Sequence, residues 1–200
     1  RRSSDLPEAV AAWRQTGMAH DAAPVPQRPQ ERQAWMRFKS QTLTRFTLDL
    51  RQAVQAIRGP QVKTARNLFA LPILEPQSEA WFAQNLDDFL AAYDWTVPMA
   101  MPLMESVPID ASQAWLTRLV QAVARHPGAL KKTIFELQAR DWNRRQQNAI
   151  PDQQLADWMR LLRLNGVKNY GYYPDDFINN QPDISRIRPQ FSSWWYPDHD

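Results

Sequence analysis

Apolar residues recur every three to five positions between Gln30 and Ile57, the spacing that places side chains on one face of an α-helix. The sequence Arg58-Gly59-Pro60 ends this pattern, because glycine and proline both stop helices. Beyond it, short apolar runs alternate with further helical patterns. The predicted strands are Val62–Leu71, Asp94–Met101, Lys132–Gln138 and Val167–Gly171. The predicted helices are Pro7–Gln15, Gln30–Ile57, a helix capped by Ser78, Ala111–Arg125, and Asp152–Leu164 followed by Gly166 as its C-cap, with a loop over Pro72–Gln77.

This order of elements predicts an α/β fold. Strands that alternate with helices form parallel sheets with right-handed crossovers. A TIM-type barrel needs eight strands and about 250 residues, whereas four strands are predicted here. We therefore expect the C-terminal half of a (β/α)8 barrel, with four parallel strands alternating with helices, and a small open sheet is the alternative. The opening Arg1-Arg2-Ser3-Ser4, without an initiator Met, suggests a chain cut from something longer.

The composition argues against several classes of protein function. The net charge of +3 is small and evenly spread, so nucleic acid is not an expected partner. No apolar stretch approaches the roughly 20 residues of a membrane span. Cysteine is absent and the three histidines lie far apart, so neither a thiol nor a metal site is indicated. The unusual feature is nine Trp, eight Phe and five Tyr, which indicates either a bulky core or a surface that stacks on sugar rings.

Aromatic and acidic residues follow the predicted strands, where barrel enzymes carry their sites. Aromatic rings stack on the apolar faces of pyranose rings, and carboxylates accept protons from hydroxyl or ammonium groups. Glu136 is the weak catalytic candidate, because an acidic side chain in a strand near the barrel mouth needs a charged or hydrogen-bonding partner, or has a functional role. The candidate substrate-binding residues are Trp142, Tyr170, Tyr172, Tyr173, Asp175, Asp176, Trp81 and Glu105.

Each candidate has a structural alternative. Trp81 has helical spacing with Leu86 and Phe89 and could belong to the core. The three tyrosines after the last strand cannot all face one way, so at least one is expected to be structural. One of the two adjacent aspartates could cap a short helix, and Glu105 could be solvated. Glycoside hydrolysis commonly needs two carboxyl groups about 5–9.5 Å apart, and sequence spacing cannot show which pair converges.

Several long motifs carry a resemblance. The segments KTARNLFALPILEPQSEAWFAQNLDDFL, YDWTVPMAMPLME, FELQARDW and NGVKNYGYYPDDF, with the ending IRPQFSSWWYP, resemble the C-terminal domain of the PgaB family, the poly-β-1,6-N-acetyl-D-glucosamine N-deacetylases of biofilm export. The resemblance covers most of residues 35–200, which would form the second half of a barrel. Residues 1–34 match poorly and are expected to be a connecting segment.

The resemblance implies a periplasmic lipoprotein of the outer membrane, with a metal-dependent deacetylase domain and a glycoside hydrolase barrel. The deacetylase domain, its divalent metal and the first half of the barrel would lie outside this chain, so no cofactor is expected here. The main catalytic acid would lie upstream of Arg1, and this chain alone would be inactive. The implied partners are the polymer, the other half of the barrel and an export porin. A non-catalytic carbohydrate-binding module and a purely structural half-domain are the alternatives.

Overall fold

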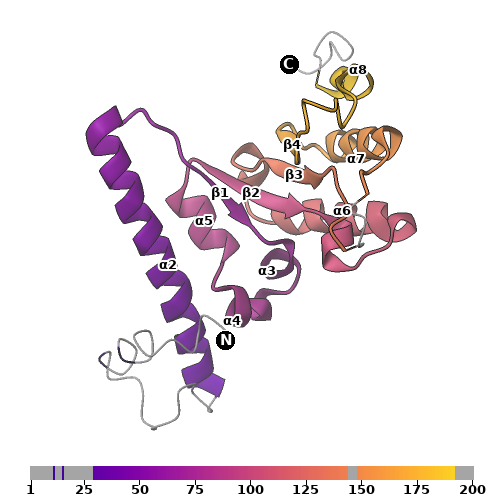
Figure 1. The fold of residues 1–200 in the computed structure, drawn as a ribbon. Helices are drawn as coiled ribbons and strands as arrows, with labels where there is room; N and C mark the ends of the chain where they lie inside the picture. Colours follow the sequence, from indigo (N-terminus) through magenta and orange to yellow (C-terminus); the bar gives the residue numbers. More distant parts are fainter. Residues whose placement is uncertain (1–10, 12–14, 16–28, 144–147, 192–200) are drawn as a thin grey trace. The chain divides into compact units, whose positions relative to one another are not determined.

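The computed structural model describes residues 11, 15, 29–143 and 148–191. Its described elements alternate between helices and strands along the chain (Figure 1). They are α2 (Pro29–Arg58), β1 (Ala65–Leu68), α3 (Ala70–Leu74), η2 (Pro76–Ser78), α4 (Glu79–Phe82), α5 (Leu86–Ala92), β2 (Trp95–Ala100), η3 (Pro102–Glu105), α6 (Ile109–Ala124), η4 (Ala129–Lys131), β3 (Phe135–Gln138), α7 (Asp152–Leu164), β4 (Tyr170–Tyr173), α8 (Ile184–Ile187) and η5 (Arg188–Gln190). The prediction of an α/β fold with four parallel strands that alternate with helices is confirmed. The predicted helix Pro7–Gln15 and the residues Trp194, Trp195 and Tyr196 lie largely or wholly outside the described residues.

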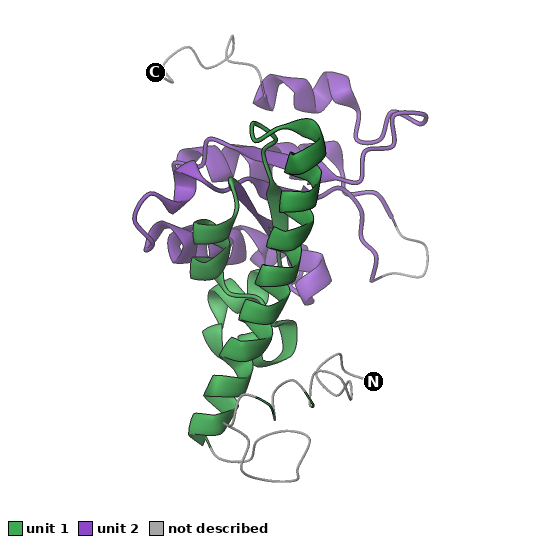
Figure 2. Ribbon diagram, turned by 90° about the vertical axis from the view of Figure 1, so that its left-hand side faces the viewer, with its two compact units in different colours: residues 1–94 green, residues 95–200 purple. Residues whose placement is uncertain are grey.

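The chain divides into two compact units, Arg1–Asp94 and Trp95–Asp200 (Figure 2). In the first unit, the predicted long helix is confirmed as α2. It ends at Arg58 and is followed by Gly59, whose φ of 93° favours glycine. Helices α4 and α5 pack against α2. The core of this unit includes the fully or almost fully buried side chains of Trp35, Leu68, Leu86, Phe89 and Tyr93.

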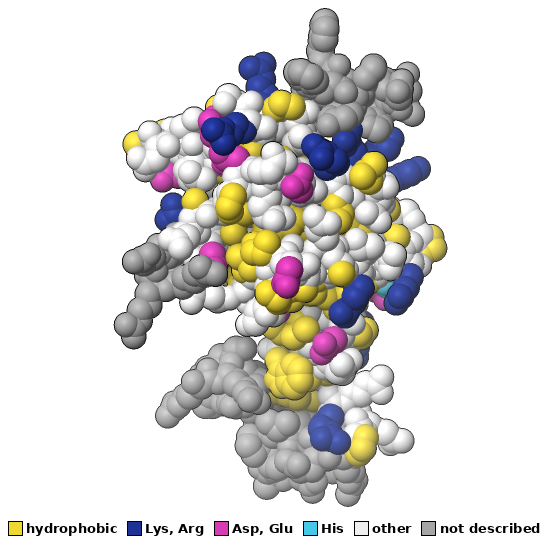
Figure 3. Space-filling model, turned by 90° about the vertical axis from the view of Figure 1, so that its right-hand side faces the viewer, with side chains coloured by type: hydrophobic (Ala, Val, Ile, Leu, Met, Phe, Trp, Pro, Cys, Tyr) yellow, Lys and Arg dark blue, Asp and Glu magenta, His cyan; other side chains and the backbone are white. Residues whose placement is uncertain are grey.

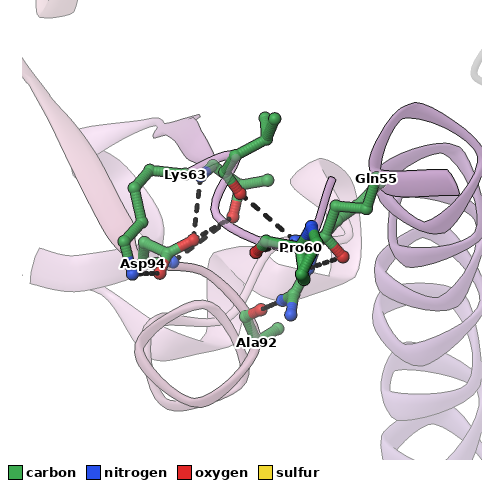
Figure 4. A network of polar contacts seen from close by, with 8 residues as sticks. Gln55, Pro60, Lys63, Ala92 and Asp94 are labelled. Carbon is green, nitrogen blue, oxygen red and sulfur yellow. Dashed lines mark hydrogen bonds and ion pairs between the residues drawn. The ribbon is translucent and has the colours of Figure 1, made fainter. Parts of the chain in front are cut away.

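A network of hydrogen bonds connects the end of α2, the segment before β1 and the end of the first unit (Figure 4). The amide of Gln55 donates to the carbonyl oxygens of Pro60 and Val62 at 3.3 and 3.2 Å. The Asp94 carboxylate accepts bonds from the Thr64 N–H at 2.8 Å and from Lys63 Nζ at 3.1 Å. These bonds hold the connection before β1 against the residue that ends the unit.

The predictions for the middle of the first unit are partly wrong. The predicted loop Pro72–Gln77 contains most of α3 and the start of η2. Ser78 lies in η2, and its side chain makes no capping bond to α4. The single helix predicted after it is two helices, because Ala83 adopts a left-handed conformation with a φ of 51°. Asn85 caps the second helix by accepting the Asp88 N–H at 3.1 Å.

In the second unit, β2, β3 and β4 form parallel pairs in chain order. Their core contacts come from α6 and α7, whose buried side chains include Leu116, Leu119, Leu155, Trp158 and Leu162. Helix α7 has the predicted bounds, and Gly166 follows it with a φ of 83°. The last strand begins three residues later than predicted. The reason is that Val167 belongs to the helix end, since its N–H bonds to the Leu162 carbonyl at 3.1 Å.

Candidate functional site

The candidate site lies at the carboxyl ends of β2, β3 and β4, all within the second unit. Because the three strands are parallel, their carboxyl ends share one edge of the sheet. The segments that leave this edge are Pro102–Glu105, Gln138–Asn143 and Tyr172–Asp176. They contain most of the predicted substrate-binding residues.

The register between β3 and β4 shows on which face of the sheet each of the three tyrosines lies. Tyr170 pairs with Phe135, and Tyr173 pairs with Gln138. Successive side chains of a strand point to opposite faces, so Tyr170 and Tyr172 share one face of β4 and Tyr173 lies on the other. The strand continues through Gly171, as the prediction required for the first two to share a side.

Tyr170 is engaged in packing within the protein. Its hydroxyl donates to the Gln190 carbonyl at 2.5 Å, and its ring lies 5.7 Å from that of Phe191. Tyr172 also approaches Phe191, at 6.2 Å, and its hydroxyl donates to Asp175 Oδ1 at 3.3 Å. Burial raises the pKa of Tyr172, and the neighbouring Asp175 carboxylate adds to this effect. Tyr170 is therefore the tyrosine with a structural role.

Trp142 and Tyr173 form an aromatic pair at the rim. Their ring centroids are 6.1 Å apart and their planes differ by 26°, a stacked arrangement. Trp142 comes from the segment after β3, whereas Tyr173 ends β4. Tyr173 is 56% exposed and Trp142 is half-buried. The pair presents flat apolar surface held by two neighbouring segments, which is the kind of surface that stacks on sugar rings.

The two adjacent aspartates have different surroundings. Asp176 lies 3.8 Å from Arg140 and accepts two bonds from Asn179, at 2.9 and 3.2 Å. The Asn179 bonds, followed by the Arg140 charge, hold the pKa of Asp176 below its usual value. Asp176 thus organises the turn that follows β4. Asp175 is exposed and bonds to Tyr172, so its carboxylate is the more accessible to a ligand.

The remaining candidates are more dispersed. Glu136 is half-buried in β3, and Glu105 is the half-buried last residue of η3. Trp81 belongs to the first unit and is 61% exposed in α4. Its expected place on one apolar helix face with Leu86 and Phe89 is wrong, because α4 ends before these two buried residues.

The site also contains Gln138 and Asn143, which the predicted set of binding residues omits. Gln138 is fully buried at the end of β3, and Asn143 donates a short bond to the Leu103 carbonyl. A buried polar side chain needs partners, so a glutamine that follows the apolar Leu137 at the end of the strand was a signal available in the sequence.

Within residues 29–143 and 148–191, no group of three acidic or histidine side chains is placed to hold a metal ion. No helix in this part of the chain is both long and apolar enough to cross a membrane.

Comparison with solved structures gives a close match to the PgaB (BpsB) glycoside hydrolase domain from Bordetella bronchiseptica. The TM-score is 0.86 at 43% sequence identity, over 94% of this chain and 52% of that chain. The chain therefore spans about half of the solved domain, and it shares its fold.

Comparison with curated proteins finds two similar relatives, both called poly-beta-1,6-N-acetyl-D-glucosamine N-deacetylase, from Escherichia coli strains K12 and O157:H7. Each is 53% identical over 193 residues, which are 96% of this chain and 29% of the relative. The family model described as hypothetical glycosyl hydrolase family 13 matches residues 2–173. That match covers most of the sequence, so the chain belongs to this glycosyl hydrolase family.

Proposed function

We propose that this chain binds partly deacetylated poly-β-1,6-N-acetyl-D-glucosamine and, within a complete domain, takes part in its glycosidic cleavage during modification and export of a biofilm exopolysaccharide. The observation that carries this proposal is the stacked pair of Trp142 and Tyr173 at the strand ends of a glycosyl hydrolase family member. The names of the similar proteins supply the substrate class.

The chemistry of the rim suits such a polymer. The aromatic pair offers apolar surface to a pyranose face. Asp175 offers a carboxylate to the ammonium group of a deacetylated sugar, and Tyr172 holds that carboxylate through its hydroxyl. Figure 3 shows one face of the molecule, on which hydrophobic side chains gather and single acidic and basic side chains lie among and around them. A local acidic and apolar surface attracts a cationic polymer even when the whole chain carries +3.

Cleavage is the part of the proposal that needs more than this chain. The chain spans about half of the solved domain and less than a third of its curated relatives. We place the main catalytic acid outside these 200 residues and keep Glu136 as the candidate within them. We also place the deacetylase domain with its divalent metal outside this chain. The proposed partners are the other half of the barrel and an export porin, and the proposed location is the periplasmic side of the outer membrane.

The binding site is tested by Trp142→Ala. Its affinity for a partly deacetylated β-1,6-glucosamine pentamer, measured by calorimetry on the intact protein, should fall about tenfold, or about 1.4 kcal/mol. Phe177→Ala is the control, because this aromatic side chain is 82% exposed and takes no part in the Trp142–Tyr173 pair. Equal affinities for Trp142→Ala and the unaltered protein would refute the site.

Cleavage separates the proposal from its main alternative, a carbohydrate-binding module without catalysis. A complete domain that contains this chain should shorten the partly deacetylated polymer, as followed by product size. Binding without any shortening in the complete domain would favour the binding module. Turnover by the 200 residues alone would refute our placement of the catalytic acid.

A further inference from the structure

Gln138 joins two segments that leave different strands of the second unit. Its Oε1 accepts the Leu103 N–H at 2.7 Å and the Met104 N–H at 3.4 Å, both from η3. Its Nε2 donates to the Arg140 carbonyl at 2.9 Å. A single buried side chain thus satisfies backbone groups of the segments after β2 and after β3.

A second side chain completes the connection. Asn143 Nδ2 donates to the Leu103 carbonyl, so both the N–H and the C=O of Leu103 are held by side chains from the segment after β3. The Asn143 N–H in turn bonds to Asp141 Oδ1 at 3.0 Å. Trp142 lies between these two residues in the sequence, so its backbone is fixed on both sides.

We propose that Gln138 is a positioning residue for the polymer site: it fixes the Trp142 segment to η3 and so sets the place of the Trp142 ring beside Tyr173. This inference rests on the proposed function. Gln138 is fully buried, so it acts through its backbone partners and does not itself touch a polymer. If it is replaced by an apolar side chain, the Leu103 N–H and the Arg140 carbonyl lose their partner, and both segments must move to regain hydrogen bonds.

Fluorine NMR of the intact protein labelled with 5-fluorotryptophan tests this directly, with the Trp142 resonance assigned from Trp142→Phe. Gln138→Leu should shift or broaden that resonance and weaken binding of the partly deacetylated pentamer about tenfold. Leu162→Ala is the control, because it opens a cavity at the carboxyl end of α7, away from both segments. It should lower the melting temperature while leaving the Trp142 resonance and the affinity unchanged.

Gln138→Glu separates positioning from a general loss of stability. A carboxylate can still accept from Leu103 but cannot donate to the Arg140 carbonyl, whereas the protonated acid can do both. The affinity and the Trp142 resonance of this variant should therefore return toward those of the unaltered protein as the pH falls, and those of Gln138→Leu should not. An unchanged Trp142 resonance in Gln138→Leu, or equal effects of Gln138→Leu and Leu162→Ala on it, would overturn the proposal. Because the resonance is read without ligand, it tests the positioning role even if the intact protein binds no polymer.

Discussion

At the scale of single residues, Asp94 is the carboxylate with the largest described change in acidity. Its pKa is lowered to about 2, first by the Thr64 backbone N–H and then by Lys63. A carboxyl group whose pKa is lowered in the folded state stabilises it above the unfolded value, near 4, and this contribution is lost as the pH falls toward 2. Asp94→Asn should therefore lower the free energy of unfolding by about 1 kcal/mol at pH 7.

Urea unfolding at a series of pH values checks this expectation, and the difference between Asp94→Asn and the unaltered protein should shrink below about pH 4. Lys63→Met is the matched control. Its ammonium group is mostly exposed, and exposed ion pairs contribute about 0–1 kcal/mol, so it should cost less than Asp94→Asn. A difference that stays constant from pH 7 downward would show that the hydrogen bonds do not depend on the charge.

The residues of the candidate site were more readily predicted by type than by role. The sequence placed aromatic and acidic residues after the third and fourth strands. In the structure Trp142, Asp175 and Asp176 follow β3 and β4, whereas the three tyrosines lie within β4. The sequence could not assign the three tyrosines to faces, because the strand starts three residues later than the apolar pattern indicates. Nor could it separate Asp175 from Asp176. The bonds from Asn179 to Asp176 form only in the folded turn, and Arg140, which lies 36 positions earlier than Asp176, meets it only in the folded chain.

At the scale of elements, left-handed backbone positions decide where helices and turns end. Ser106 follows η3 with a φ of 60° and is exposed. Glycine adopts this conformation without the cost that a Cβ atom adds, about 1 kcal/mol. Ser106→Gly should thus raise the free energy of unfolding by up to about 1 kcal/mol. Thermal unfolding should show a higher melting temperature.

The matched control for Ser106→Gly is Ala114→Gly, at an exposed position inside α6. Glycine in a helix interior costs about 1 kcal/mol relative to alanine, so this variant should lower the melting temperature. Effects of the same sign in both variants would contradict the conformational explanation.

The same conformational cost explains the helix break at Ala83, which the sequence did not predict because alanine normally continues a helix. The capping signal of Asn85, three residues before Asp88, was present in the sequence and marks the start of α5.

At the scale of the whole molecule, α2 shows how far a sequence pattern can be taken. Its apolar spacing correctly predicted a helix of nearly the observed length. An apolar helix face is normally buried against another element, yet the later apolar positions of α2 are between 41% and 83% exposed. They are Leu43, Phe46, Leu50, Val54 and Ile57. Periodicity shows which residues share a face, but it does not show whether the partner of that face lies in the same stretch of chain.

We expect this face to be covered by chain that lies outside the present sequence. This chain matches about half of that glycoside hydrolase domain, and an apolar helix stripe is normally buried against another element. We expect the rest of such a domain to pack on the stripe. In a complete domain, Leu50→Asp would then bury a charge and lower the free energy of unfolding by about 2–4 kcal/mol. Gln52→Asp, exposed on another side of the same helix, should change it by less than about 0.5 kcal/mol. Urea unfolding of both variants measures the difference, and equal small effects would mean that the stripe remains in contact with solvent in the complete domain.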